Sequence, residues 1–145
     1  MSRRVFTKFM EGIAVDTGTA WTEESAITSW LAQEDIEVIG FQLGARAYLS
    51  DQNDDLAEIV GELSQAGLMH QDGLIGRCTG AHYWNTVPQS VDRECDSPVV
   101  MFPEGLAVPV KEEGYLYLHA ATKGAVGTHM TWKVWAIVYY TKRGG

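Results

Sequence analysis

The sequence has few of the features that mark metal sites, secreted scaffolds and membrane spans. Its 145 residues include two cysteines, Cys78 and Cys95, with no CxxC spacing and no histidine at zinc-finger distance. No segment approaches the roughly 20 apolar residues of a membrane span, and no apolar run of signal-peptide length follows the N-terminus. We therefore expect a protein that is made in the cytoplasm and has no membrane partner. Two free thiols are favoured, although a disulfide stays open if the two Cα atoms lie within about 7 Å.

Basic charge is also scarce. The chain has 11 Lys and Arg residues against 19 Asp and Glu, for a net charge of −8. Because an acidic surface repels phosphate, nucleic acid is not an expected partner.

The motifs of catalysis and cofactor binding are missing as well. The chain has no G-x-G-x-x-G, no Walker loop and no H-x-H pair of the kind that holds a cupin metal. His119 and His129 approach each other if they lie on paired strands, but zinc needs three or four ligands. Neighbouring carboxylates are read as solvated turns instead of acid–base pairs: Glu34/Asp35, Asp54/Asp55 and Glu112/Glu113. The sequence therefore predicts no enzyme, no metal and no cofactor.

The strongest feature that is present is one long strand near the C-terminus. Side chains alternate across a strand, so seven even positions form one apolar face: Thr128, Met130, Trp132, Val134, Ala136, Val138 and Tyr140. At about 3.3 Å per residue this strand spans roughly 43 Å, and it must be central because an exposed edge of that length invites aggregation. The opposite face becomes apolar at Trp135, Ile137 and Tyr139. We expect a partner subunit to cover it.

Two earlier segments extend the β pattern. Between Ile36 and Leu49 one face is apolar, and Gly40 and Gly44 on the other face indicate a bulge or the close approach of another group. Residues 55–65 are ambiguous. Leu56, Ile59, Val60 and Leu63 have helical spacing, whereas a strand places Ala57, Ile59, Gly61 and Leu63 on one face. The β-rich surroundings favour the strand.

Residues 1–16 are expected to form an N-terminal arm. Three of the basic residues, Arg3, Arg4 and Lys8, lie here, either on a solvated tail or on an arm that docks on an acidic neighbouring subunit. Residues 4–10 also fit a short edge strand. We place Arg3, Arg4 and Phe6 at the predicted subunit interface.

The whole pattern predicts an all-β protein. Seven to nine short strand-like segments separated by turn signals indicate a single antiparallel β-sandwich of jelly-roll type over residues 17–145. Two packed sheets bury one face each. Tyr83 and Trp84, beside turn residues, are either part of the core or a stacking surface for a sugar or a receptor.

With these strands in order, the chain resembles the jelly-roll virion structural proteins of tailed bacterial and archaeal viruses. The resemblance rests on Trp21-Thr22 and on residues 36–41, 102–105, 113–120 and 135–140. Trimeric jelly rolls of the tumour-necrosis-factor or C1q type have similar strands, and the missing signal peptide weighs against them.

The resemblance implies a non-enzymatic structural component of a virus particle. Such a protein is a capsid decoration, minor capsid or spike protein that self-associates as a trimer and contacts the major capsid protein or other virion proteins. Its location is the virion, after synthesis in the host cytoplasm, and no catalytic residue carries over. The alternative is a carbohydrate- or receptor-binding β-sandwich module.

Overall fold

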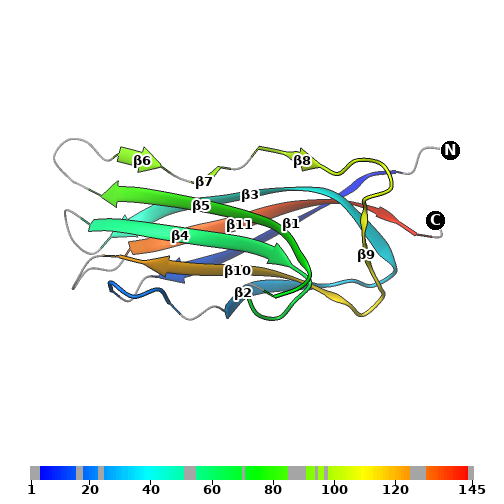
Figure 1. Ribbon diagram of the computed structural model, residues 1–145, viewed down its shortest axis with the longest axis horizontal. Coiled ribbons are helices and arrows are strands. Elements are labelled where there is room, and N and C mark those ends of the chain that lie inside the picture. The colour runs from blue at the N-terminus through cyan, green and yellow to red at the C-terminus, as the bar shows by residue number, and fades with distance from the viewer. Residues whose placement is uncertain are drawn as a thin grey trace.

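The computed structural model contains two antiparallel β-sheets packed face to face (Figure 1). It describes residues 4–15, 18–22, 25–50, 55–69, 71–84, 91–93, 95–96, 98–124 and 130–143, and of residues 25, 48–50, 55–56, 82–84, 91–93 and 95–96 it describes the backbone alone. The strands are β1 (Phe6–Val15), β2 (Ser25–Leu31), β3 (Ile36–Ser50), β4 (Asp55–Ser64), β5 (Leu74–Trp84), β6 (Val91–Arg93), β7 (Cys95–Asp96), β8 (Val100–Met101), β9 (Val108–Val110), β10 (Tyr115–Lys123) and β11 (Met130–Lys142).

The strand order is that of a jelly roll. Sheet A runs β1-β11-β3-β7, and the short strands β8 and β9 also pair with β3. Sheet B runs β2-β10-β4-β5-β6. The antiparallel pairs are nested along the chain, since β1 pairs with β11, β2 with β10, β3 with the segment β7 to β9, and β4 with β5. This winding confirms the predicted all-β sandwich of jelly-roll type.

Strand β11 is the spine of sheet A, as the alternation predicts. It lies between β1 and β3 and is 13 residues long. Its even-numbered side chains are buried between the sheets: Met130, Trp132, Val134, Ala136 and Val138. Full burial of an apolar side chain of this size stabilises a fold by roughly 1.5–3 kcal/mol, so this one face anchors the sandwich. Thr128 and His129 lie outside the described residues.

Strand β3 has the irregularity that its glycines indicate. The register with β11 shifts between Tyr139 and Tyr140, which pair with Gly40 and Val38, so Ile39 is the extra residue of a bulge. The bulge turns Val38 into the core, where it is fully buried, while Ile39 is only half-buried. The apolar face that the alternation predicts for this segment is therefore interrupted at Ile39.

Residues 55–64 are strand β4, as the β-rich context predicts. Ala57, Ile59, Gly61 and Leu63 face the core and are buried. The helical spacing of the apolar residues does not produce a helix here, because β4 pairs with β10 on one side and with β5 on the other.

Residues 6–15 form the edge strand β1, one of the two arrangements that the sequence leaves open for this segment. Each of its ten residues pairs with a residue of β11. These residues thus belong to the sandwich. Residues 16 and 17, where the predicted boundary of the arm falls, lie outside the described part of the chain.

Cys78 on β5 is disulfide-bonded, which corrects the expectation of free thiols. The sequence has one other cysteine, Cys95, whose side chain lies outside the described residues. The backbone of Cys95 pairs with Ala45 in sheet A, whereas β5 belongs to sheet B. A bond between the two cysteines therefore joins the two sheets, and the spacing of the cysteines in the chain held no sign of this.

Candidate functional site

The outer face of sheet A is the candidate functional site, because it is apolar although it points away from the core. The register pairs Phe9 with Ile137 and Ile13 with Lys133, so the odd-numbered side chains of β1 and β11 share this face. Phe9 and Ile13 are 55% and 56% exposed. We call this surface the apolar face; it consists of Phe9, Ile13, Val15, Met101, Trp135, Ile137 and Tyr139.

Three residues of the apolar face are those that the sequence singles out. Trp135, Ile137 and Tyr139 lie side by side on β11 and are half-buried. Neighbouring side chains on the same face cover part of them, and the remainder is open to solvent. Their placement agrees with the prediction of a second apolar face; their role as a subunit interface stays a prediction.

Glycines on β3 allow side chains to lie flat over the apolar face. A Cβ atom added to Gly44 would collide with the indole ring of Trp135. A Cβ atom added to Gly40 would meet the sulfur of Met101, which is 51% exposed. These are the close approaches that the two glycines predict. As a result, the ring of Trp135 covers the backbone of β3 and presents an aromatic surface outwards.

One ion pair crosses the apolar face. Lys133 Nζ lies 3.2 Å from Glu11 Oε1 on the neighbouring strand, and both side chains are partly exposed. Arg46 of β3 pairs with Lys133 in the register and is exposed. An exposed pair of this kind contributes roughly 0–1 kcal/mol to stability. Glu11 lies opposite Trp135 in the register and Lys133 neighbours Trp135 on the same face, so the face has charges of both signs beside its indole ring.

The contribution of β1 to the apolar face is the part that sequence reasoning missed. Phe9, Ile13 and Val15 alternate with Met10 and Ala14, which are buried in the core. The alternation can be read in residues 6–15, but the two apolar faces become visible only if the strand continues beyond residue 10. A short strand or an arm gives no sign of a second apolar face.

The predicted interface residues near the N-terminus lie elsewhere. Phe6 stacks on Tyr140, with ring centroids 5.5 Å apart, on the core side of β1. Arg4 and Lys142 each approach the Phe6 ring, at 5.0 and 4.7 Å from its centroid. Phe6 and Arg4 are thus held by contacts within the chain and do not join the apolar face. Arg3 lies outside the described residues.

The predicted stacking residues Tyr83 and Trp84 end strand β5. Their backbones pair with Leu56 and Asp55 of β4. Their side chains lie outside what the structure describes, so the predicted ligand contact stays untested.

A buried polar cluster lies on the outer face of sheet B. His119 on β10 is directly opposite Glu62 on β4, and the two residues are 0% and 1% exposed. Arg77 Nε lies 3.8 Å from Glu62 Oε1. His119 Nε2 donates a hydrogen bond of 2.8 Å to the backbone carbonyl of Ala66, and the ring of Tyr117 stacks on the imidazole.

The connection between β4 and β5 shields this cluster. The amide of Gln65 donates to the carbonyl of Gly73 at 3.0 Å, which closes the connection on itself. The side chain of Gln65 donates to the carbonyl of Pro109 at 2.8 Å and ties the connection to β9. Met69 within it is buried but stands apart from the main core. Solvent does not reach the imidazole or the carboxylate, so the cluster is part of the packed structure of sheet B.

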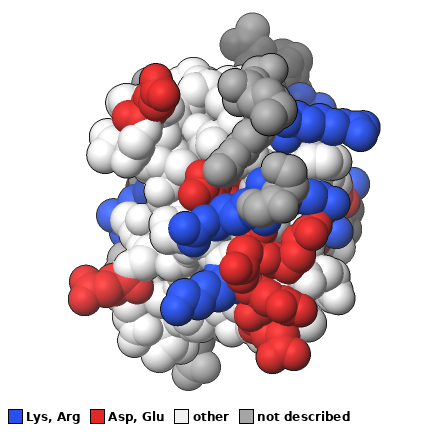
Figure 2. Space-filling view, turned by 90° about the vertical axis from the view of Figure 1, so that its right-hand side faces the viewer, with Lys and Arg blue, Asp and Glu red and all other residues white. Residues whose placement is uncertain are grey.

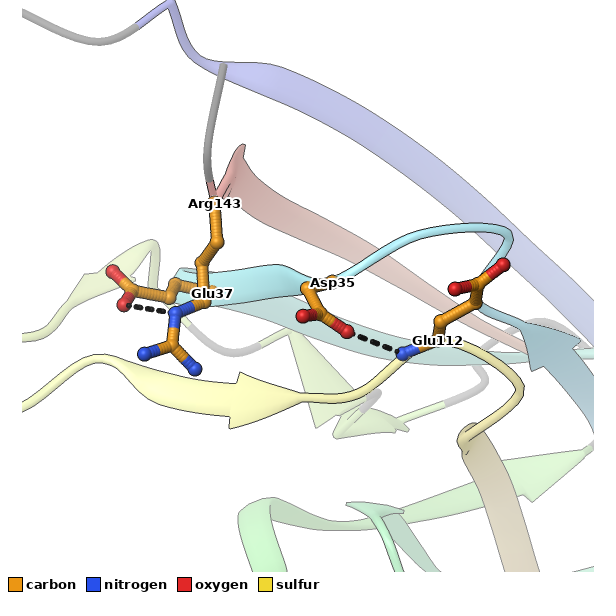
Figure 3. A network of polar contacts seen from close by, with 4 residues as sticks. All are labelled: Asp35, Glu37, Glu112 and Arg143. Carbon is orange, nitrogen blue, oxygen red and sulfur yellow. Dashed lines mark hydrogen bonds and ion pairs between the residues drawn. The ribbon is translucent and has the colours of Figure 1, made fainter.

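Charged side chains gather at the end of the sandwich where both termini lie (Figures 1 and 2). There Asp35 accepts a 2.8 Å hydrogen bond from the amide of Glu112, and Arg143 Nε lies 3.2 Å from Glu37 Oε1 (Figure 3). The carboxylate of Glu34 accepts a hydrogen bond from Lys142 Nζ at 2.8 Å and raises the pKa of this lysine. Acidic residues expected in solvated turns are therefore partly engaged in joining the turns to the C-terminal strand.

No metal site is evident in the described parts of the chain, where no three His, Cys, Asp or Glu side chains come together. The sequence lets His119 and His129 approach each other only on paired strands, but β10 and β11 belong to different sheets, and His129 itself lies outside those parts. Among the described residues, no helix is long and apolar enough to cross a membrane.

Comparison with known proteins shows remote similarity only. No protein-family model and no curated protein matches the sequence. One similar structure is a chain of infectious bursal disease virus, Gt strain, with 14% identity and a TM-score of 0.40 over 99% of this chain and 34% of that one. A CocE/NonD family hydrolase from Staphylococcus aureus has 9% identity and a TM-score of 0.41, over 93% of this chain and 37% of that one. Desmodium yellow mottle tymovirus has 9% identity and a TM-score of 0.34, over 96% and 89%.

The chain spans about a third of the length of the bursal disease virus chain. At these identities and TM-scores the similarities support no inference about function. What the structure itself establishes is an all-β jelly-roll sandwich with one apolar outer face.

Proposed function

We propose that this protein is a non-enzymatic structural component of a virus particle that self-associates through its apolar face. The single observation that carries the proposal is the exposure of Phe9 and Ile13 beside Trp135, on a face that the described residues leave uncovered. Large exposed apolar patches mark interaction sites. The assignment to a virion rests on the sequence resemblance to viral jelly-roll proteins.

The dimensions of the apolar face support contact with another protein. Strands β1 and β11 pair over ten residues, or roughly 33 Å, and three strands are roughly 14 Å wide. The flat footprint is therefore roughly 500 Å², more than half of the roughly 800 Å² per partner of a standard interface. Side chains and the segments around the rim supply the remainder.

A second copy of this chain is the partner that the charges favour. Glu11 and Lys133 form an ion pair across the centre of the face, so these two charges do not repel a second copy. The −8 charge of the whole chain opposes association at its other surfaces. We take a trimer as the expected assembly because the viral proteins that the sequence resembles form trimers, and capsid decoration, minor capsid or spike positions as its place in the particle.

Two experiments test the proposal. Sedimentation equilibrium of the purified protein over a dilution series measures self-association, and a monomer that persists at about 100 μM contradicts it. Mass spectrometry of purified virus particles tests the second part: recovery of this chain at a fixed ratio to the major capsid protein is expected, and its absence contradicts a role in the virion. The first result can hold while the second fails, which would leave a self-associating protein outside a virion.

A further inference from the structure

A groove on the outer face of sheet B lies beside an exposed tryptophan. It has a volume of about 490 Å³ and is lined by Trp21, Glu58, Ile59, Val60, Thr79, Gly80 and Ala81. We propose that this groove binds a neutral saccharide, one of whose sugar rings packs against the indole of Trp21. The proposal does not depend on self-association, because the groove and the apolar face lie on different sheets.

Backbone contacts next to Trp21 hold it at the groove. The amide of Thr22 donates to the carbonyl of Thr122 at 2.8 Å, and the amide of Thr122 donates to Thr22 Oγ1 at 3.0 Å. These two bonds attach the segment before β2 to strand β10. Trp21 is 45% exposed there, so its position is set while much of its surface is open. A large aromatic surface with a polar edge is suited to a ligand that has both an apolar face and hydroxyl groups.

The charges at the groove favour a neutral ligand. Lys123 Nζ lies 3.2 Å from Glu58 Oε2, and the same ammonium group lies 5.0 Å from the centroid of the Trp21 ring. The ion pair leaves no net charge at this point. An anionic ligand would meet the carboxylate of Glu58, and a cationic ligand would meet the ammonium of Lys123. Hydroxyl groups, by contrast, can donate to the carboxylate and accept from the ammonium.

The size and floor of the groove fit one or two sugar rings. Its volume falls within the roughly 300–1,000 Å³ of small-molecule sites. The floor near β5 has short side chains, Thr79 and Ala81, with Gly80 between them. A floor of short side chains beside an aromatic ring leaves room for a sugar ring. This location differs from the predicted stacking pair Tyr83 and Trp84, although it lies on the same strand as they do.

Titration of the ¹⁵N-labelled protein with neutral disaccharides tests the proposal. The probes are lactose, maltose, cellobiose and N,N′-diacetylchitobiose, with sialyllactose as an anionic comparison. We expect at least one neutral probe to shift the amide resonances of Thr79, Gly80 and Ala81 saturably, and sialyllactose to bind more weakly than lactose. Trp21→Ala should weaken that binding at least tenfold.

Tyr115→Ala is the matched control, since Tyr115 is an aromatic residue with 43% exposure on the same sheet but outside the groove. It should leave binding unchanged. Unfolding in urea verifies that both variants are folded, and the shift map of the unmodified protein gives an answer that needs no variant. If no neutral probe shifts these amides at about 50 mM, or if Trp21→Ala binds like the unmodified protein, the proposal is wrong.

Discussion

Replacing the two most exposed large apolar side chains of β1 should separate the subunits. In the single chain, Phe9 and Ile13 are 55% and 56% exposed, so only about half of each is buried. We consider the double variant Phe9→Thr, Ile13→Thr, because threonine keeps the β-branched shape that suits a strand while it lowers the apolar area.

The size of the effect follows from the exposed half of each side chain. Full burial of a phenylalanine or isoleucine contributes roughly 1.5–3 kcal/mol, so covering the exposed half contributes roughly 1 kcal/mol per side chain. Two such side chains on each of two contacting subunits amount to roughly 4 kcal/mol. A loss of that size weakens the contact roughly a thousandfold. The free energy of unfolding of the single chain should fall by at most roughly 2 kcal/mol, because half of each side chain is already buried within it.

Sedimentation equilibrium measures the association, and unfolding in urea measures the stability of the chain. Leu74→Thr is the matched control, because Leu74 is 48% exposed but belongs to β5 in sheet B, whereas the apolar face lies on sheet A. The control should associate like the unmodified protein. If the double variant and the control both associate as strongly as the unmodified protein, the apolar face is not the interface and the reasoning fails.

Three further perturbations test how the fold is held. Gly44→Ala forces the indole ring above it to move and should cost roughly 1–3 kcal/mol in urea unfolding; Gly67→Ala, which has no neighbour within 4 Å of the added Cβ, should cost little, and equal stability of the two variants contradicts the packing described for the apolar face. Cys78→Ala should lower the free energy of unfolding by roughly 3 kcal/mol more under oxidising conditions than under reducing ones. Two titratable thiols in the native protein would show that the bond does not form. His119→Ala removes the donor to the β4–β5 connection and should cost roughly 1–3 kcal/mol and accelerate amide hydrogen exchange at residues 65–73, and unchanged exchange there would show that the buried cluster does not hold this connection.

The long strands were predictable because their information is local. The period of two at 128–140 and 36–49 depends only on which residues alternate, and the core side chains of β11, such as Trp132 and Val134, are those that the alternation selects. Residues 55–64 show where a local pattern is insufficient. Leu56, Ile59 and Leu63 satisfy a helix as well as a strand, and pairing with β10 and β5 decided between them.

Contacts between distant parts of the chain were not predictable. His119 and Glu62 are 57 positions apart, yet the register of β10 with β4 places them opposite each other, and the connection after β4 buries them. The link from Cys78 to the other sheet and the groove beside Trp21 arise in the same way. A register cannot be read from one strand alone, because each strand offers two faces and many possible partners.

The sequence by itself determined that this is an all-β chain with a central strand that is apolar on both faces, since alternation along one strand requires no knowledge of its neighbours. Only the tertiary structure decided what lies beside that strand. It placed Phe9 and Ile13 of β1 next to Ile137 and Lys133, and so extended the apolar face from one strand to its neighbour. It also turned Phe6 away from that face, because odd and even residues of a strand point to opposite sides.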